Sequence, residues 1–293
     1  MIKKALFTTL ILLIAHFTLV EMFAPTYQTG QHLWQDNVIK AQNYLYETPE
    51  PQGVVIGSSL SARLDEELLP AGFHNLALGG LGVHDGLKVI RAHGKLPNIV
   101  CAELNLVTRP PSKDFDNTVF SPVMNPVRRL IPSFREKHQP IGIIGNGIMN
   151  LKGGKQDKKA DAPLGPTDAE RGKSDAAFQA ILDKAVKNNQ EAWDQALLDE
   201  WIAKLKADVS WLQEQGVEVV FFEMPISELS CDLPKLGSVR TAMEEAFSGS
   251  GVRFLPRPDC GQYRTTDGAH LNPASANAFS RWLTSHLQQD AAQ

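Results

Sequence analysis

The fold prediction starts from the segment Val54-Val55-Ile56-Gly57-Ser58-Ser59-Leu60-Ser61-Ala62-Arg63-Leu64. Three β-branched residues run directly into a glycine and two serines, and a sequence that can form a helix follows. This order predicts a strand, a tight turn and a helix. A serine in that turn would lie at the carboxyl end of its strand, where open α/β sheets bind ligands and where the next helix directs its free N–H groups. Ser59 is therefore a candidate nucleophile, although it could instead cap the helix.

The rest of the chain alternates between apolar, strand-like segments and helical patterns. Such alternation predicts an α/β fold with a doubly wound parallel sheet, because parallel strands need long right-handed crossovers. The nearly continuous apolar runs at 99–102 and 219–222 fit strands that are covered on both faces. The predicted strands are residues 54–57, 73–77, 99–103, 217–222 and 252–255, and the predicted helices are 60–69, 82–93, 194–215, 235–247 and 273 to about 288.

A long connection, from about residue 107 to 190, separates the third and fourth predicted strands. Its first part, 108–147, is rich in Pro, Arg and Phe, and we expect it to cover the mouth of the candidate site, although it could be a decoration of the domain. Its middle, 152–175, contains almost nothing to bury, which predicts a segment that is mobile in part.

The N-terminus combines Lys3 and Lys4 with an apolar run from Ala5 to Val20. The run falls between a signal-peptide core and a membrane span of ~20 residues, and the lysines predict that the chain starts inside and continues outside. Since no clear cleavage site follows, we expect an uncleaved anchor at 1–23. A cleaved signal and a buried helix remain alternatives. A linker and docking segment at 24–52, with a helical stretch at 37–46, would then lead to a domain at 53–290.

The formal net charge is −4, and no basic run is longer than two residues. Nucleic-acid binding needs a concentrated positive surface, so the composition argues against it. This composition fits a neutral or carbohydrate-like partner better than it fits nucleic acid. No Cys/His spacing resembles a zinc site, and neither a metal nor another cofactor is indicated. Among the cysteines, Cys101 fits a small core residue, whereas Cys231 and Cys260 lie in loop-like sequence and could pair in an oxidising compartment.

A carboxylate and an imidazole occur three residues apart in Asp267-Gly268-Ala269-His270, just before Pro273 and the last predicted helix. A serine hydroxyl is a poor nucleophile at neutral pH and needs a base such as imidazole to take its proton. His270 could serve as that base, with Asp267 orienting the ring. The two residues could alternatively cap the last helix.

Four segments, in order from Val54 onward, resemble the sequence blocks of the SGNH, or GDSL-type, hydrolases. Gly57-Ser58-Ser59-Leu60 matches the first block, with Ser59 at the nucleophile and Ser58 where Asp is usual. Asn75-Leu76-Ala77-Leu78-Gly79-Gly80 fits the spacing of the second. Glu103-Leu104-Asn105-Leu106 keeps the Asn of the third, Gly-x-Asn-Asp, but has Glu for Gly and Leu for Asp. Asp267-Gly268-Ala269-His270 matches the fourth.

This resemblance implies a flavodoxin-like sheet and assigns catalysis to Ser59, His270 and Asp267. It also implies an oxyanion hole formed by the N–H groups of Ser59 and Gly80 and the amide of Asn105. The glycines could serve only a tight strand-to-helix turn, and Asn105 could be a satisfied strand-end amide. His84, which follows the glycine turn, and Arg63 are candidate substrate-binding residues.

The anchor, the Gly-Ser-Ser and Glu-Leu-Asn blocks and the long insertion together resemble the membrane-tethered SGNH proteins of bacterial exopolysaccharide acetylation, such as alginate O-acetylation. The resemblance implies a periplasmic domain held at the inner membrane, with a carbohydrate substrate and a membrane-bound O-acyltransferase as partner. The expected function is a serine esterase or O-acyltransferase that moves an acetyl or other short acyl group to or from carbohydrate hydroxyls through an acyl-Ser59 intermediate. A lipid or small-ester hydrolase and an inactive polysaccharide-binding subunit remain alternatives.

Overall fold

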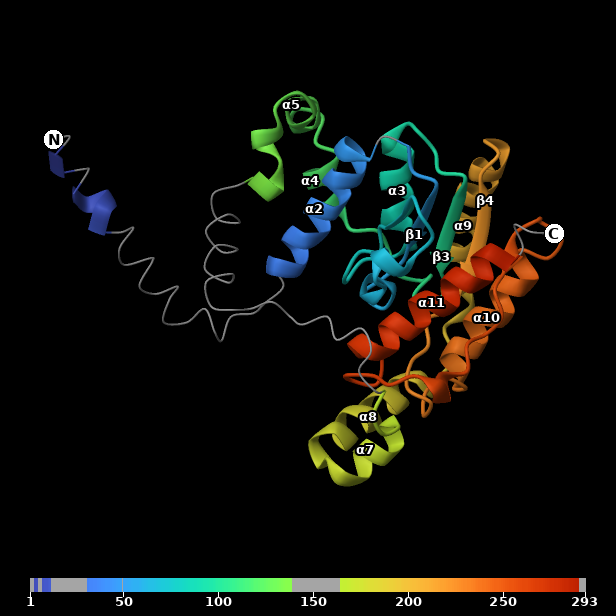
Figure 1. Cartoon of the computed structure of the whole chain (residues 1–293). Coiled ribbons are helices and arrows are strands. Elements are labelled where there is room, and N and C mark those ends of the chain that lie inside the picture. The colour runs from blue at the N-terminus through green and yellow to red at the C-terminus, as the bar shows by residue number, and fades with distance from the viewer. Residues whose placement is uncertain (1–2, 5–6, 12–30, 49, 139–163, 290–293) are drawn as a thin grey trace.

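The computed structural model describes residues 3–4, 7–11, 31–48, 50–138 and 164–289, and a single parallel sheet lies at its centre (Figure 1). The sheet has five strands in the order β2-β1-β3-β4-β5, and all four pairings are parallel. This confirms the predicted α/β class, and the order is the flavodoxin-like one, whose switch point lies between β1 and β3. The strands are β1 Gly53–Ile56, β2 Phe73–Asn75, β3 Ile99–Glu103, β4 Glu218–Phe222 and β5 Arg253–Phe254.

Alternate residues of the central strands point to opposite faces of the sheet, and both faces are covered. On one face, Val54 and Ile56 belong to a core cluster shared with helices α2 (Gln31–Glu47), α3 (Val83–His93) and α9 (Gln195–Glu214). On the other face, Val55 belongs to a cluster shared with α11 (Pro273–Gln289). This two-sided burial explains why the strands are continuously apolar. Further α-helices in the described part of the domain are α4 Lys113–Val119, α5 Met124–Leu130, α7 Asp168–Ser174, α8 Ala176–Asn189 and α10 Pro234–Ala246.

The helix predicted at 60–69 is wrong. Two short 3₁₀ turns, η1 Ser61–Arg63 and η2 Glu66–Leu68, replace it. The chain is extended at Leu64 and Asp65, and the Asp65 carboxylate accepts a hydrogen bond from the backbone N–H of Glu67, which starts the second turn. This local side-chain contact competes with a continuous helix. The other 3₁₀ turns are η3 Pro132–Phe134, η4 Glu136–His138 and η5 Cys260–Gln262.

The N-terminal part of the described chain enters the domain through α2. This helix begins before the predicted stretch at 37–46 and buries Val38, Ala41 and Tyr44 in the core. Most of the predicted anchor at 1–23 lies outside the described residues, so the anchor stays a prediction. Among the residues that the structure does describe, no helix has both the length and the apolar character needed to cross a membrane.

The two described parts of the long insertion lie at opposite ends of the domain (Figure 1). Helices α4 and α5 and the η4 turn lie beside α2, where the Tyr46 hydroxyl donates to the Asn125 side chain and Arg135 pairs with Glu47 at 2.9 Å.

 Of the segment 108–147 that we expected to cover the mouth of the site, the structure describes residues 108–138, and helices α4 and α5 within it lie beside α2 (Figure 1). Residues 139–147 lie outside the described residues, and the cover over the mouth stays a prediction. Helices α7 and α8 instead lie near the start of α11, at the carboxyl end of the sheet (Figure 1). Although the predicted mobile middle at 152–175 looked poor in structure, its described residues 164–175 include the regular helix α7, which Thr167 and Glu170 cap reciprocally.

Candidate active site

The predicted site residues follow strand ends at one edge of the sheet. Ser59 follows β1, Gly80 follows β2 and Asn105 follows β3. Asp267 and His270 lie in the segment between β5 and α11. Because all five strands are parallel, these segments lie at the same edge, and the switch point between β1 and β3 is where open α/β sheets bind ligands.

Ser59, His270 and Asp267 form a continuous chain of hydrogen bonds. The distance between Nε2 of His270 and Oγ of Ser59 is 2.8 Å, and Nδ1 of His270 lies 2.8 Å from Oδ2 of Asp267. With Nδ1–H donated to the carboxylate, Nε2 is left to accept the Ser59 hydroxyl proton. This is the geometry by which a serine oxygen becomes a nucleophile.

The second oxygen of Asp267 fixes the backbone of the same turn. Oδ1 accepts hydrogen bonds from the backbone N–H groups of Ala269, at 3.1 Å, and His270, at 2.8 Å. Burial by itself raises the pKa of Asp267, but the hydrogen bonds and positive charge from His270 and the Ala269 N–H outweigh it and lower the pKa to about 2. Asp267 is therefore ionised at neutral pH and can stabilise an imidazolium.

Only one of the three nearby serines faces the histidine. The hydroxyls of Ser58 and Ser61 both donate to the carboxylate of Glu103, at 2.7 Å and 2.5 Å. The Ser59 side chain lies between them in sequence and bonds His270 instead. Sequence reasoning treated Glu103 as a departure from a motif and gave it no role.

The glycine loop after β2 is held by α2. The Asn37 side chain donates to the carbonyl of Gly79 at 2.7 Å and accepts from its N–H at 2.9 Å. Gly80 is exposed and has a φ of +75°, in the left-handed region that favours glycine. Its N–H remains our prediction for one oxyanion-hole donor. Sequence reasoning missed Asn37, because nothing in the local pattern around it marks a contact with a distant loop.

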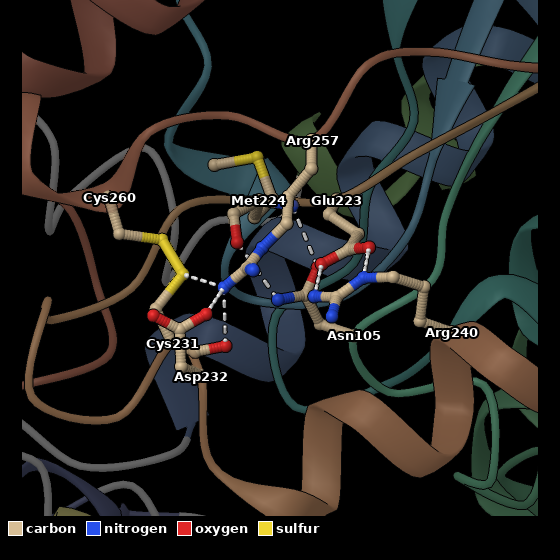
Figure 2. A network of polar contacts seen from close by, with 8 residues as sticks. All are labelled: Asn105, Glu223, Met224, Cys231, Asp232, Arg240, Arg257 and Cys260. Atoms are coloured by element: carbon tan, nitrogen blue, oxygen red, sulfur yellow. Dashed lines mark hydrogen bonds and ion pairs between the residues drawn. A yellow bond between two sulfur atoms is a disulfide. The ribbon is translucent and has the colours of Figure 1, made fainter.

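Asn105 is buried and anchored to the end of β4 (Figure 2). Its Nδ2 donates to the carbonyl of Met224 at 2.9 Å, and its Oδ1 accepts from the N–H of the same residue at 2.7 Å. A primary amide carries two N–H donors, so this contact leaves one for another acceptor. The structure thus fixes the orientation of the side chain, and its place in the oxyanion hole remains a prediction.

The two candidate substrate-binding residues lie in different surroundings. His84 is only 5% exposed, its Nε2 lies 3.0 Å from the carbonyl of Val107, and its ring packs on Trp201 at 5.0 Å. Burial lowers its pKa. The prediction that His84 faces the pocket is therefore replaced by a packing role. Arg63 is exposed and lines a cavity of about 750 Å³ together with Leu271 and Asn277. That cavity lies beside the site, since neither Ser59 nor His270 lines it.

The turn that carries Asp267 and His270 is supported by the second part of the insertion. The Asp168 carboxylate, in α7, accepts from the N–H and hydroxyl of Thr265 at 3.0 Å and 2.5 Å. Gly268 has a φ of +82°, and a Cβ there would lie 3.0 Å from the Cβ of Ala185 in α8. Close packing by α8 thus fixes the turn at the position that orients the imidazole.

Cys231 and Cys260 are joined in a disulfide (Figure 2). It links the segment after β4 to the segment before α11. An Nη2 of Arg257 donates to the Cys231 carbonyl at 2.9 Å and also bonds Asp232. Cys101 is buried and free, and burial raises the pKa of its thiol to about 12. Within the described ranges, no group of three or more His, Cys, Asp or Glu side chains could hold a metal ion.

The fold and the site define a doubly wound α/β protein with a Ser-His-Asp hydrogen-bond chain at the carboxyl edge of its sheet. No protein-family model matches the chain, and no curated protein matches it. The crystal structure of a "putative acylhydrolase" from Bacteroides fragilis NCTC 9343 is similar to it, with a TM-score of 0.41 and 13% sequence identity over 90% of this chain and 96% of that one. A likeness at this level carries no argument about function, which must come from the site.

Proposed function

We propose that this protein is a serine-dependent esterase or O-acyltransferase that works through an acyl-Ser59 intermediate. The observation that carries the proposal is the pair of 2.8 Å contacts that connect Ser59, His270 and Asp267. The order of its four sequence segments and the flavodoxin-like strand order also support a relationship with the SGNH hydrolases.

The chemistry follows from which atoms give and take protons. Nε2 of His270 removes the Ser59 proton as Oγ attacks the ester carbonyl, and Asp267 stabilises the imidazolium. The N–H groups of Ser59 and Gly80 and the free N–H of the Asn105 amide meet the negative oxygen of the tetrahedral intermediate. His270 then protonates the leaving alcohol, which leaves the acyl group on Ser59. In the second half, His270 deprotonates water or an acceptor hydroxyl, which attacks the acyl group and frees the serine.

The proposed substrates are acetyl or other short acyl esters of carbohydrate hydroxyls on the outer side of a bacterial inner membrane. The apolar N-terminal run behind two lysines supports a tethered, extracytoplasmic domain. The Cys231–Cys260 disulfide supports an oxidising compartment. A membrane-bound O-acyltransferase is the proposed partner, as the supplier of acetyl groups.

Mass spectrometry of the full chain after incubation with p-nitrophenyl acetate tests the acyl-enzyme. We expect a burst of p-nitrophenol and one acetyl group on Ser59, and Ser59→Ala should abolish both. Ser285→Ala is the matched control, because Ser285 is an exposed serine of α11 that bonds only within its helix. A wild-type protein that binds polysaccharide but shows neither burst nor adduct would instead be a binding subunit.

Adding an oligosaccharide acceptor to the same reaction separates transfer from hydrolysis. Acetyl groups on the oligosaccharide would indicate an O-acyltransferase, and free acetate alone would indicate an esterase. A clear preference for long-chain acyl esters over acetyl esters would contradict the proposed substrate class and favour a lipid hydrolase.

A further inference from the structure

Glu103 ends β3 as a buried carboxylate directly against the turn that carries Ser59. Its side chain is 1% exposed, and it accepts hydrogen bonds from two backbone N–H groups and two hydroxyls. Oε2 accepts from the N–H groups of Ser58 and Ser61 at 2.9 Å and 3.2 Å. The Ser58 hydroxyl lies 2.7 Å from Oε1, and the Ser61 hydroxyl lies 2.5 Å from Oε2. One carboxylate therefore binds the turn on both sides of Ser59.

The sheet register brings Glu103 to this place. Ile56 of β1 pairs with Ala102 of β3, so the next residues along the two strands, Gly57 and Glu103, lie side by side. A Cβ on Gly57 would lie 2.5 Å from Oε2 of Glu103 and 2.3 Å from the hydroxyl of Ser61. Glycine at 57 is therefore needed for the carboxylate to reach the turn, and this explains the residue independently of any motif.

These contacts leave Ser59 as the serine whose hydroxyl is available to His270. The hydroxyls of Ser58 and Ser61 donate their hydrogen bonds to Glu103, and the Ser58 oxygen also accepts from the N–H of Leu60 at 3.1 Å. An ionised carboxylate can only accept hydrogen bonds, so it fixes the direction of all four. A glutamine at 103 could not, because its amide nitrogen, in place of Oε1, would donate to the Ser58 hydroxyl and reverse the direction of that hydrogen bond.

We propose that Glu103 is a positioning residue for Ser59, and that it replaces, from β3, the carboxylate that the resembled Gly-Asp-Ser block carries at position 58. The inference rests on the proposed function. It gives one physical reason for both departures in the sequence: Ser58 and Glu103 form a complementary pair, with the acid moved from one strand end to the neighbouring one. Glu103 does not contact the reacting atoms and acts through the Ser59 turn.

The first test is Glu103→Gln, with steady-state kinetics on p-nitrophenyl acetate and the rate at which a fluorophosphonate labels Ser59. We expect kcat and the labelling rate to fall about 10²-fold, as small misplacements of a reacting group can do, while KM changes less than threefold. Glu223→Gln is the matched control. It also removes a carboxylate from a network, the bidentate pair with Arg240 at 2.6 Å, but that pair does not touch the Ser59 turn (Figure 2).

A second variant keeps the test independent of whether Glu103→Gln folds. Ser58→Ala/Ser61→Ala retains Glu103 but removes both hydroxyl donors, and we expect a smaller fall in kcat with KM again nearly unchanged. A third variant, Ser58→Asp/Glu103→Gly, returns the acid to position 58. We expect its kcat to be at least tenfold higher than that of Glu103→Gly alone.

The inference is overturned if folded Glu103→Gln, or the double serine variant where the former does not fold, keeps kcat within twofold of wild type. It is also overturned if the fall in kcat of Glu103→Gln is no larger than the loss of folded protein explains, or no larger than the fall in kcat of Glu223→Gln. These results differ from a failure of the proposed function, which would appear as a wild-type protein that forms no adduct on Ser59.

Discussion

Asp267 is held in its ionised form by the turn that it organises. Its two oxygens accept from the ring and from the backbone of His270. Burial raises its pKa, but these hydrogen bonds outweigh burial and bring the pKa from the ordinary 3.8 down to about 2. A folded-state pKa below the unfolded value means that the ionised group adds stability that is fully present above about pH 4 and is lost as the pH falls toward 2.

Asp267→Asn separates this contribution from those of other carboxylates. We expect the difference in unfolding free energy between wild type and variant to be constant from neutral pH down to about 5 and to narrow between pH 4 and 2. Activity at neutral pH should fall steeply, since the corresponding change in a serine protease costs about 10⁴ in kcat. Urea unfolding at stepped pH measures the first effect. Asp199→Asn, at an exposed carboxylate of α9, is the matched surface control. If Asp267 were merely a cap, the narrowing would remain, because backbone N–H groups also lower its pKa, but Asp267→Asn would keep its activity at neutral pH.

The sequence revealed those site residues that lie in short local patterns. Ser59 follows a strand-and-glycine pattern, and Asp267 and His270 stand three residues apart before a helix. The role of Glu103 could not be predicted, because it depends on contacts with Ser58, 45 residues away, that exist only once β1 and β3 pair. From the sequence alone, Glu103 was visible only as a residue that did not fit.

Helix α2 belongs to the site as much as to the core. Asn37 is 4% exposed and satisfies both backbone groups of Gly79, next to the proposed oxyanion donor Gly80. A Cβ at Gly79 would lie 2.3 Å from Leu33, so α2 also packs directly on this loop. The segment that the sequence indicated only as a docking region thus orients the peptide group next to Gly80, the proposed oxyanion donor.

Asn37→Ala should therefore impair catalysis more than packing alone would explain. The substitution leaves the buried N–H and carbonyl of Gly79 without partners, which costs about 1–3 kcal/mol of unfolding free energy. We expect kcat to fall by about tenfold or more, with KM little changed. The fall should not exceed the ~10²–10³-fold loss that removing an oxyanion-hole donor itself typically causes. Asn125→Ala is the control, since Asn125 also bonds α2, through Tyr46, but away from the glycine loop. Equal effects of the two variants on kcat would refute the role of Asn37.

The α7–α8 hairpin supports the acid and base of the site from outside the sheet. Its contacts could not be predicted from sequence, because Asp168 and Thr265 are 97 residues apart. Likewise, the 60–69 segment has helical composition, but the extended backbone at Leu64 and Asp65 and the Asp65 cap on Glu67 divide it into two turns. Element type was predictable where one face of a helix or strand is consistently apolar, and it failed where single polar contacts decide the backbone.

Gly268→Ala tests this support. The variant places a side chain at a φ of +82°, which costs about 1–2 kcal/mol, and brings its Cβ to 3.0 Å from Ala185. We expect a loss of stability together with a marked fall in kcat, because the turn must shift away from α8 and take His270 with it. Gly216→Ala is closely matched, since Gly216 has a φ of +81° and open space around its Cβ position. It should lose similar stability and keep its kcat, and a Gly268→Ala variant that did the same would show that α8 does not position the histidine.

At the scale of the whole molecule, the strand order is what turns separate segments into a site. Ser59 and His270 are 211 residues apart, and the chain reaches the second only after completing all five strands. The fold class was predictable because the alternation of strands and helices spans the chain. The junction of the two ends was predicted only through the resemblance to the SGNH hydrolases, since it requires the order 2-1-3-4-5, which the alternation alone does not specify.

The Cys231–Cys260 disulfide links the segment after β4 to the segment before α11, over a sequence separation of 29 residues. A crosslink over a loop of this length should stabilise the folded chain by about 2–4 kcal/mol, mainly by restricting the unfolded state. We therefore expect a reductant to lower the urea midpoint of the wild type to that of Cys231→Ala/Cys260→Ala, which should itself not respond to reductant. The variant should retain most of its activity at low temperature. The Arg257 side chain still bonds the carbonyl at 231, and the contacts among Ser59, His270 and Asp267 do not involve sulfur. A wild-type midpoint that is unaffected by complete reduction would show that the disulfide adds nothing to stability.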